Sequence, residues 1–163
     1  MPALHRLLLL LLLLPSLTLA ASPGKSAIAS AHPLATEAGQ QILAVGGNAF
    51  DAAVTVSAVL AVVEPYSSGI GGGGFWLLHR KDGPEVMVDG RETAPGKAHR
   101  DMYLDAKGDI VPGLSMDGPL AAGIPGEPAA LVHIAEQYGK LPLSQTLAPA
   151  IQLAREGFAV TPH

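Results

Sequence analysis

The amino-acid sequence predicts an α/β fold, because helical and strand-like segments alternate along 163 residues. Apolar residues recur at helical spacing in residues 35–45, 48–63, 128–138 and 143–155. Between the second and third of these segments, two extended apolar stretches flank the turn Lys81-Asp82-Gly83, which is typical of a β-hairpin. The expected order is therefore two helices, a hairpin and two further helices.

The first two helices have clear boundary signals. Pro33 suits the first turn of a helix, and the paired glycines Gly46-Gly47 follow its last periodic residue and end it. Asn48 is placed to cap the second helix, which runs to Val63 and is apolar or small on nearly every face. A helix of that composition is expected to be buried on all sides.

Three strands and one long loop are predicted in the remaining sequence. Residues 27–31 form a short apolar stretch that predicts a strand, and residues 75–80 and 85–89 predict the two strands of the hairpin. Residues 99–126 contain repeated Gly, Pro and Asp with few periodic apolar positions, which predicts irregular structure.

The first 21 residues have the layout of a secretory signal peptide. A basic start precedes an unbroken apolar run at residues 7–14, and small residues lead to cleavage after Ala20 or Ala21. The run is too short for a membrane anchor, which needs about 20 apolar residues. We therefore expect a mature region of residues 22–163 and a periplasmic or secreted location.

The composition excludes several classes of function. The 14 acidic residues exceed the 10 basic ones, and no run of basic residues exists, so no nucleic-acid partner is expected. The absence of cysteine excludes a thiolate nucleophile and a cysteine-ligated metal. The histidines show no metal-ligand spacing. We therefore expect neither a metal nor another cofactor.

Four consecutive glycines, residues 71–74, precede the first hairpin strand. Glycine lets a ligand or another backbone approach closely, so the run either lines a substrate site or serves tight backbone packing. A phosphate-binding loop would follow a strand and open a helix, whereas here a helix precedes and a strand follows. The sequence thus leaves the first two alternatives open and disfavours a nucleotide site.

Arg91 is the candidate substrate-binding residue, at the end of the second hairpin strand. A guanidinium group binds a carboxylate through two parallel hydrogen bonds and keeps its charge at any working pH. Alternatively, Arg91 pairs with Asp89 and Glu92 as a solvated charge cluster, which contributes little free energy. Residue types alone favour the charge cluster.

Five segments, taken in order, resemble a known family. They are GGNAFDAA at 46–53, GIGGGGF at 69–75, DGRETAP at 89–95, GIPG at 123–126 and LAREGF at 153–158. In this order and spacing they resemble successive blocks of the large subunit of γ-glutamyltranspeptidases, over residues 27–163. The resemblance implies the fold of N-terminal nucleophile hydrolases, an αββα sandwich of two sheets enclosed by helices, present here only in part.

The resemblance also implies an activity. In that family a precursor cuts itself into a large and a small subunit, and the new N-terminal threonine of the small subunit attacks the γ-glutamyl amide of glutathione. The implied partners are glutathione or another γ-glutamyl substrate, a water, amino-acid or peptide acceptor, and the chain's own small subunit. Arg91, within the DGRETAP segment, is implied to bind the α-carboxylate of the γ-glutamyl group.

The catalytic threonine belongs to later sequence of the family, so we expect no catalytic residue in this chain and no activity from this piece alone. Thr93 and Thr161 do not stand at a subunit N-terminus. We read the chain as a fragment or a truncated gene product. Two alternatives stay open: a related acylase that removes glutaryl side chains from cephalosporins and other β-lactams, and a secreted binding module without catalysis.

The signal-peptide assignment predicts that the precursor loses about 20 residues on export. Mass spectrometry of the exported protein should therefore find an N-terminus close to Ser22. Recovery of membrane-bound protein that still begins at Met1 would contradict the assignment.

Overall fold

The structure is a computed structural model that describes residues 26–160. The proposed signal peptide, residues 1–21, lies outside the described residues. The elements are α2 (Pro33–Ala44), α3 (Ala49–Val63), β1 (Gly74–Leu78), β2 (Val86–Gly90), the 3-10 helix η1 (Pro119–Ala121), α4 (Glu127–Tyr138), α5 (Leu143–Thr146) and α6 (Ala148–Glu156).

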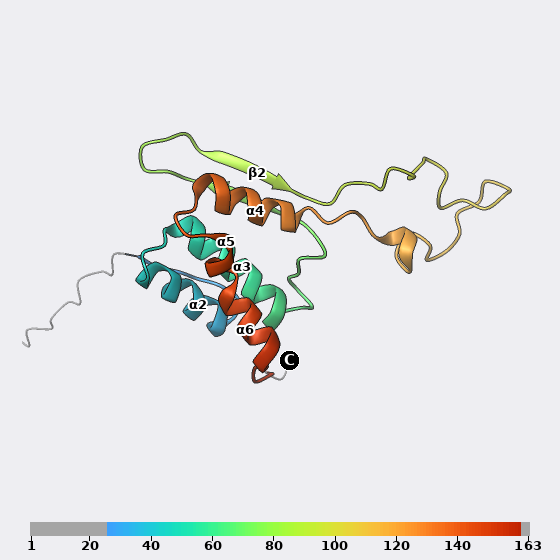
Figure 1. The fold of residues 1–163 in the computed structure, drawn as a ribbon. Helices are drawn as coiled ribbons and strands as arrows, with labels where there is room; N and C mark the ends of the chain where they lie inside the picture. The colour runs from blue at the N-terminus through green and yellow to red at the C-terminus, as the bar shows by residue number, and fades with distance from the viewer. Residues whose placement is uncertain (1–25, 161–163) are drawn as a thin grey trace, which may run out of the picture.

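Helix α3 is the central element, in contact with α2, α4, α5 and α6 (Figure 1). The β-hairpin packs against both α3 and α4, and Figure 1 shows β2 beside α4. Two apolar clusters result. One joins α2, α3 and α6 and contains Ala35, Ala38, Ala58, Val59, Val63 and Ala150. The other joins α3, the hairpin and α4 and contains Val54, Leu78, Leu131, Ile134 and Ala135.

The boundary between α2 and α3 confirms the sequence prediction. Gly46 has φ +99°, a left-handed conformation in which glycine follows the end of a helix without strain. The Asn48 side chain accepts hydrogen bonds from the backbone N–H groups of Phe50 and Asp51, at 2.8 and 3.0 Å. The Asp51 carboxylate in turn accepts one from the Asn48 N–H at 2.8 Å. This reciprocal capping box fixes the start of α3.

Asp51 also connects α3 to the end of α4. Its carboxylate is fully buried and accepts hydrogen bonds from the backbone N–H groups of Lys140 and Leu141, at 3.0 and 3.2 Å. The Asn48 amide donates to the Tyr138 carbonyl at 2.7 Å. Three backbone N–H groups therefore converge on one buried carboxylate, which compensates for its removal from water.

The hairpin confirms the predicted turn and two antiparallel strands, with Trp76 opposite Val88 and Leu77 opposite Met87. Trp76 and Val88 are half-buried and pack toward the cluster that contains α4. The other face carries Phe75, Leu77 and Met87, each at least 60% exposed. Strand β1 begins one residue earlier and ends two residues earlier than the sequence predicted.

Two predictions about the secondary structure were wrong, one entirely and one in part. Residues 27–31 do not form a strand, because no strand of the described residues lies beside them to pair with their backbone groups. The helix predicted at 143–155 is divided at Leu147 into α5 and α6. Pro149 explains the division, since it has no N–H to continue the α5 hydrogen bonds and lies in the first turn of α6, where that N–H is not needed.

Helix α3 is not buried on all sides. Val56 and Leu60 are only half-buried and line a cavity together with residues 26–29. The irregular segment predicted at 99–126 is confirmed apart from η1, and it projects away from the helices (Figure 1).

The described residues show part of the predicted fold class. They contain one two-stranded sheet with helices against one of its faces, which agrees with an α/β class. The two-sheet αββα sandwich is not seen in residues 26–160. Within the same residues, no helix has both the length and the apolar character needed to cross a membrane.

Replacement of Asp51 tests the connection between α3 and α4. Asp51→Ala should lower the free energy of unfolding by at least about 3 kcal/mol, because three backbone N–H groups lose their shared, buried acceptor. The measurement is urea unfolding of the full-length protein that contains residues 22–163. Glu37→Ala, at an exposed position of α2, is the control and should change this free energy by less than about 0.5 kcal/mol. Equal effects of the two substitutions would contradict the assigned role.

Candidate functional site

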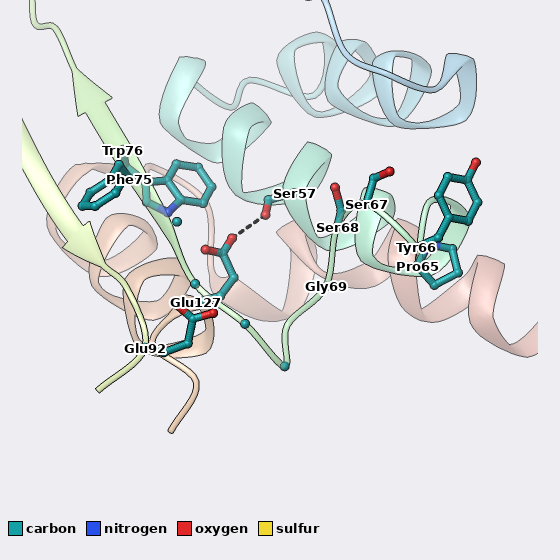
Figure 2. Close-up of a pocket in the computed structure, with 14 residues that line it drawn as sticks. Ser57, Pro65, Tyr66, Ser67, Ser68, Gly69, Phe75, Trp76, Glu92 and Glu127 are labelled. Atoms are coloured by element: carbon teal, nitrogen blue, oxygen red, sulfur yellow. Dashed lines mark hydrogen bonds between the residues drawn. The ribbon is translucent and has the colours of Figure 1, made fainter. Parts of the chain in front are cut away.

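A pocket of about 670 Å³ opens beside the glycine run (Figure 2). Its wall is formed by residues 65–69 after α3, by the glycines 71–74, and by Phe75 and Trp76 of β1. Side chains from three further places complete it: Ser57 of α3, Glu92 after β2 and Glu127 at the start of α4. Segments that are far apart in sequence therefore meet at one concave surface.

The glycine run packs against backbone at one position and lines the pocket at others. Gly73 packs against backbone: a Cβ atom there would lie 2.6 Å from the Gly90 carbonyl oxygen and 2.7 Å from the Arg91 Cα. Gly71, in contrast, has open space where a Cβ atom would stand, and it lines the pocket. Gly72 also lines the pocket, and its carbonyl oxygen accepts hydrogen bonds from the backbone N–H groups of α4's first turn.

A short backbone bridge brings two of the motif segments together. The Thr93 N–H donates to the Ile124 carbonyl at 3.1 Å, and the Ile124 N–H donates back at 2.9 Å. This bridge joins the DGRETAP segment to the GIPG segment beside the glycine run. The segments at 46–53 and 153–158 contribute no residue to the pocket wall, and they form the capped start of α3 and the end of α6.

Ser57 and Glu127 form the polar contact drawn in Figure 2. The Ser57 hydroxyl donates to Glu127 Oε1 at 2.6 Å, and Glu127 is only 8% exposed. Sequence analysis missed both residues. The available signals were a serine within a largely apolar helix and a glutamate directly after the GIPG segment. Neither signal could show that residues 70 positions apart are in contact.

The pocket carries further polar groups. Local desolvation, a hydrogen bond with Glu64 and the negative charge of Glu64 raise the pKa of the Tyr66 hydroxyl above its ordinary value. The phenol is therefore a neutral hydrogen-bonding group at neutral pH. Ser67 and Ser68 add hydroxyl groups to the wall (Figure 2). Nowhere in residues 26–160 do three potential metal ligands come together.

Arg91 lies next to the pocket, not in its wall. Its side chain is 65% exposed, and Nε is 3.6 Å from Glu92 Oε2. The guanidinium carbon lies 5.9 Å from the centre of the Phe75 ring, within the range of a cation–π contact. The Arg91 backbone N–H donates to Asp89 Oδ1 at 3.0 Å. The guanidinium therefore has a neighbouring carboxylate and an aromatic support, and it remains accessible to a ligand.

Comparisons with known proteins agree on one family. A family model described as gamma-glutamyltranspeptidase matches residues 35–163. The chain is 45% identical over 133 residues to the glutathione hydrolase proenzyme of Escherichia coli (strain K12), and 40% identical over 149 residues to the acylase ACY 1 proenzyme of Pseudomonas sp. (strain SE83). The crystal structure of Helicobacter pylori gamma-glutamyltranspeptidase superposes with a TM-score of 0.82 at 48% identity.

The alignments cover most of this chain and a minority of each relative. They span 82% of this chain and 23% of the glutathione hydrolase proenzyme, and 88% of this chain and 27% of the acylase proenzyme. The superposition covers 86% of this chain and 40% of the Helicobacter pylori chain. The chain thus spans about a quarter of the length of the curated relatives.

Two glycines of the run provide a matched test of the pocket's construction. Gly73→Ala should lower the free energy of unfolding by about 2 kcal/mol or more, because the added methyl group meets backbone atoms that cannot move aside. Gly71→Ala should change it by less than about 0.5 kcal/mol, since that position is open. Neither glycine has a positive φ, so the comparison isolates packing. Thermal unfolding of the full-length variants measures the difference, and equal stabilities would refute the packing role of Gly73.

Proposed function

The chain belongs to the γ-glutamyltranspeptidase family, and from this premise we propose that residues 22–163 are the N-terminal part of the large subunit of a γ-glutamyl-transferring and hydrolysing enzyme. The observation that carries the proposal is a pocket whose wall contains the glycine run and Glu92 of the DGRETAP segment, with the GIPG segment bridged to Thr93 and with Arg91 beside it. Glutathione and other γ-glutamyl compounds are the proposed substrates. Water, amino acids and peptides are the proposed acceptors.

Arg91 is proposed to bind the α-carboxylate of the γ-glutamyl group. The end of β2 and the bond to Asp89 hold its backbone, while Phe75 supports the guanidinium. Glu92 meets only one edge of the guanidinium, at Nε, so further N–H groups can donate to a substrate carboxylate. A planar guanidinium can then form two parallel hydrogen bonds, which orient the acyl group as well as bind it.

The bond-breaking chemistry is proposed to depend on a threonine at the N-terminus of a small subunit, which is released from the same precursor by self-cleavage. Its hydroxyl oxygen would attack the γ-carbonyl carbon while its own amino group takes the proton. The amide C–N bond breaks, the amine leaves with a proton, and water or an acceptor amine then releases the γ-glutamyl group. A cleaved signal peptide and a periplasmic or secreted location complete the proposal.

A related acylase is the second candidate function, and the identity with the acylase ACY 1 proenzyme favours it. A glutaryl group has a free carboxylate that Arg91 could bind in the same way. It has no α-ammonium group, so the two acyl groups differ at one charged position. Since the matched relatives are named as hydrolases and acylases, an enzyme is favoured over a secreted binding module.

The proposal predicts the kinetic effect of replacing Arg91 in the full-length, self-processed enzyme. Arg91→Ala should raise the free-energy barrier measured by kcat/KM for a γ-glutamyl anilide by roughly 3 kcal/mol or more. Arg91→Lys should recover only part of the loss, because an ammonium group keeps the charge but lacks the planar fork. The assay measures initial rates with both γ-glutamyl and glutaryl anilides, which also separates the two candidate functions.

Two controls make this test specific. Arg100→Ala removes an arginine whose side chain is 95% exposed and should leave kcat/KM within about twofold, as expected for a surface substitution. A γ-glutamyl anilide whose α-carboxylate is replaced by an amide should be a poor substrate already, and Arg91→Ala should harm it little further. If Arg91→Ala weakens turnover of the acid and of the amide equally, Arg91 is not the carboxylate anchor.

A further inference from the structure

Glu127 occupies a position that the proposed chemistry does not use. It is the first residue of α4, is 8% exposed and lines the pocket, and its carboxyl group points toward Ser57 (Figure 2). Oε1 accepts the 2.6 Å hydrogen bond from Ser57. Oε2 lies against the glycine run, 3.2 Å from where a Cβ atom of Gly74 would stand.

The backbone of the same residue holds the glycine run from the other side. The N–H groups of Gly126 and Glu127 both donate to the Gly72 carbonyl oxygen, each at 3.1 Å. The backbone at the start of α4 therefore holds the glycine run, and the Glu127 side chain joins that end of α4 to Ser57 of α3. The next glycine, Gly73, packs directly on the backbone of Gly90 and Arg91. A displacement of the run would thus change its position relative to Arg91.

We propose that Glu127 is a positioning residue that, through its hydrogen bond with Ser57, fixes the glycine run at the distance from Arg91 that substrate binding requires. The kinetic part of this inference rests on the proposed function, and the structural part does not. Glycines have no side chains with which to hold themselves in place, so a run of four depends on its neighbours for a defined conformation. Glu127 and Ser57 supply that constraint from two helices.

The test uses the full-length, processed enzyme with Glu127→Ala, Glu127→Gln and Ser57→Ala. Glu127→Ala and Ser57→Ala should each lower kcat/KM for a γ-glutamyl anilide by roughly tenfold, mainly through KM, because one hydrogen bond to a carboxyl group is lost. Glu127→Gln keeps an acceptor oxygen for Ser57 and should stay within about threefold of the parent. The double substitution should be no worse than Glu127→Ala alone, since both remove the same contact.

Amide hydrogen exchange over residues 66–78 supplies a readout that does not depend on activity. Exchange there should accelerate in Glu127→Ala and Ser57→Ala and stay at the parental rate in Glu127→Gln. Glu136→Ala is the matched control, at an exposed position of the same helix, and should change neither exchange nor kinetics.

The outcomes separate this inference from the proposed function. Unchanged exchange in Glu127→Ala would overturn the positioning role, and so would faster exchange without any change in KM. Should Glu127→Ala fail to fold, Ser57→Ala and Glu127→Gln decide the question in the same way. If the parent enzyme turns over neither γ-glutamyl nor glutaryl anilides, the proposed function fails, and hydrogen exchange alone supports or overturns the role of Glu127.

Discussion

The buried carboxylate of Asp51 is the interaction on which the arrangement of the helices depends. It closes the capping box of α3 and accepts the N–H groups that follow α4. About 9 Å further along α3, at a rise of about 1.5 Å per residue, Ser57 meets the first residue of α4. Helix α4 is therefore attached to α3 at both of its ends, and the two helices run antiparallel.

This attachment determines where the pocket lies. The GIPG segment leads directly into α4, and its bridge to Thr93 brings the end of the hairpin to the same place. The glycine run leads from the end of α3 into β1, and the three atoms nearest to a Cβ atom at Gly73 are all backbone atoms of residues 90–92. The positions of the helices, the hairpin and the glycine run thus follow from one packing arrangement. The pocket is the space that this arrangement leaves beside them.

Local signals in the sequence were enough for most of the helices and the hairpin. Gly46 and Asn48 act on their own neighbours, so the helix boundaries they predict are the ones observed. Local signals do not predict which distant segments come into contact. The contact between Ser57 and Glu127 depends on the tertiary packing of α3 and α4, and the apolar stretch at 27–31 shows that β-propensity makes no strand without a neighbour. Pro149 indicates a break in the helix, but the helical spacing of the apolar residues around it predicted one continuous helix.

Relatives named as glutathione hydrolases and as an acylase align with this chain about equally well. If Arg91 binds a terminal carboxylate, it reads a group that γ-glutamyl and glutaryl substrates share. An arginine cannot distinguish them, because they differ only in the ammonium group on the neighbouring carbon. Recognition of that ammonium requires an acceptor that meets the α-carbon from another direction. The anchor and the glycine run can therefore be common to both activities, while the choice between them is made by groups that contact the substrate beyond its carboxylate.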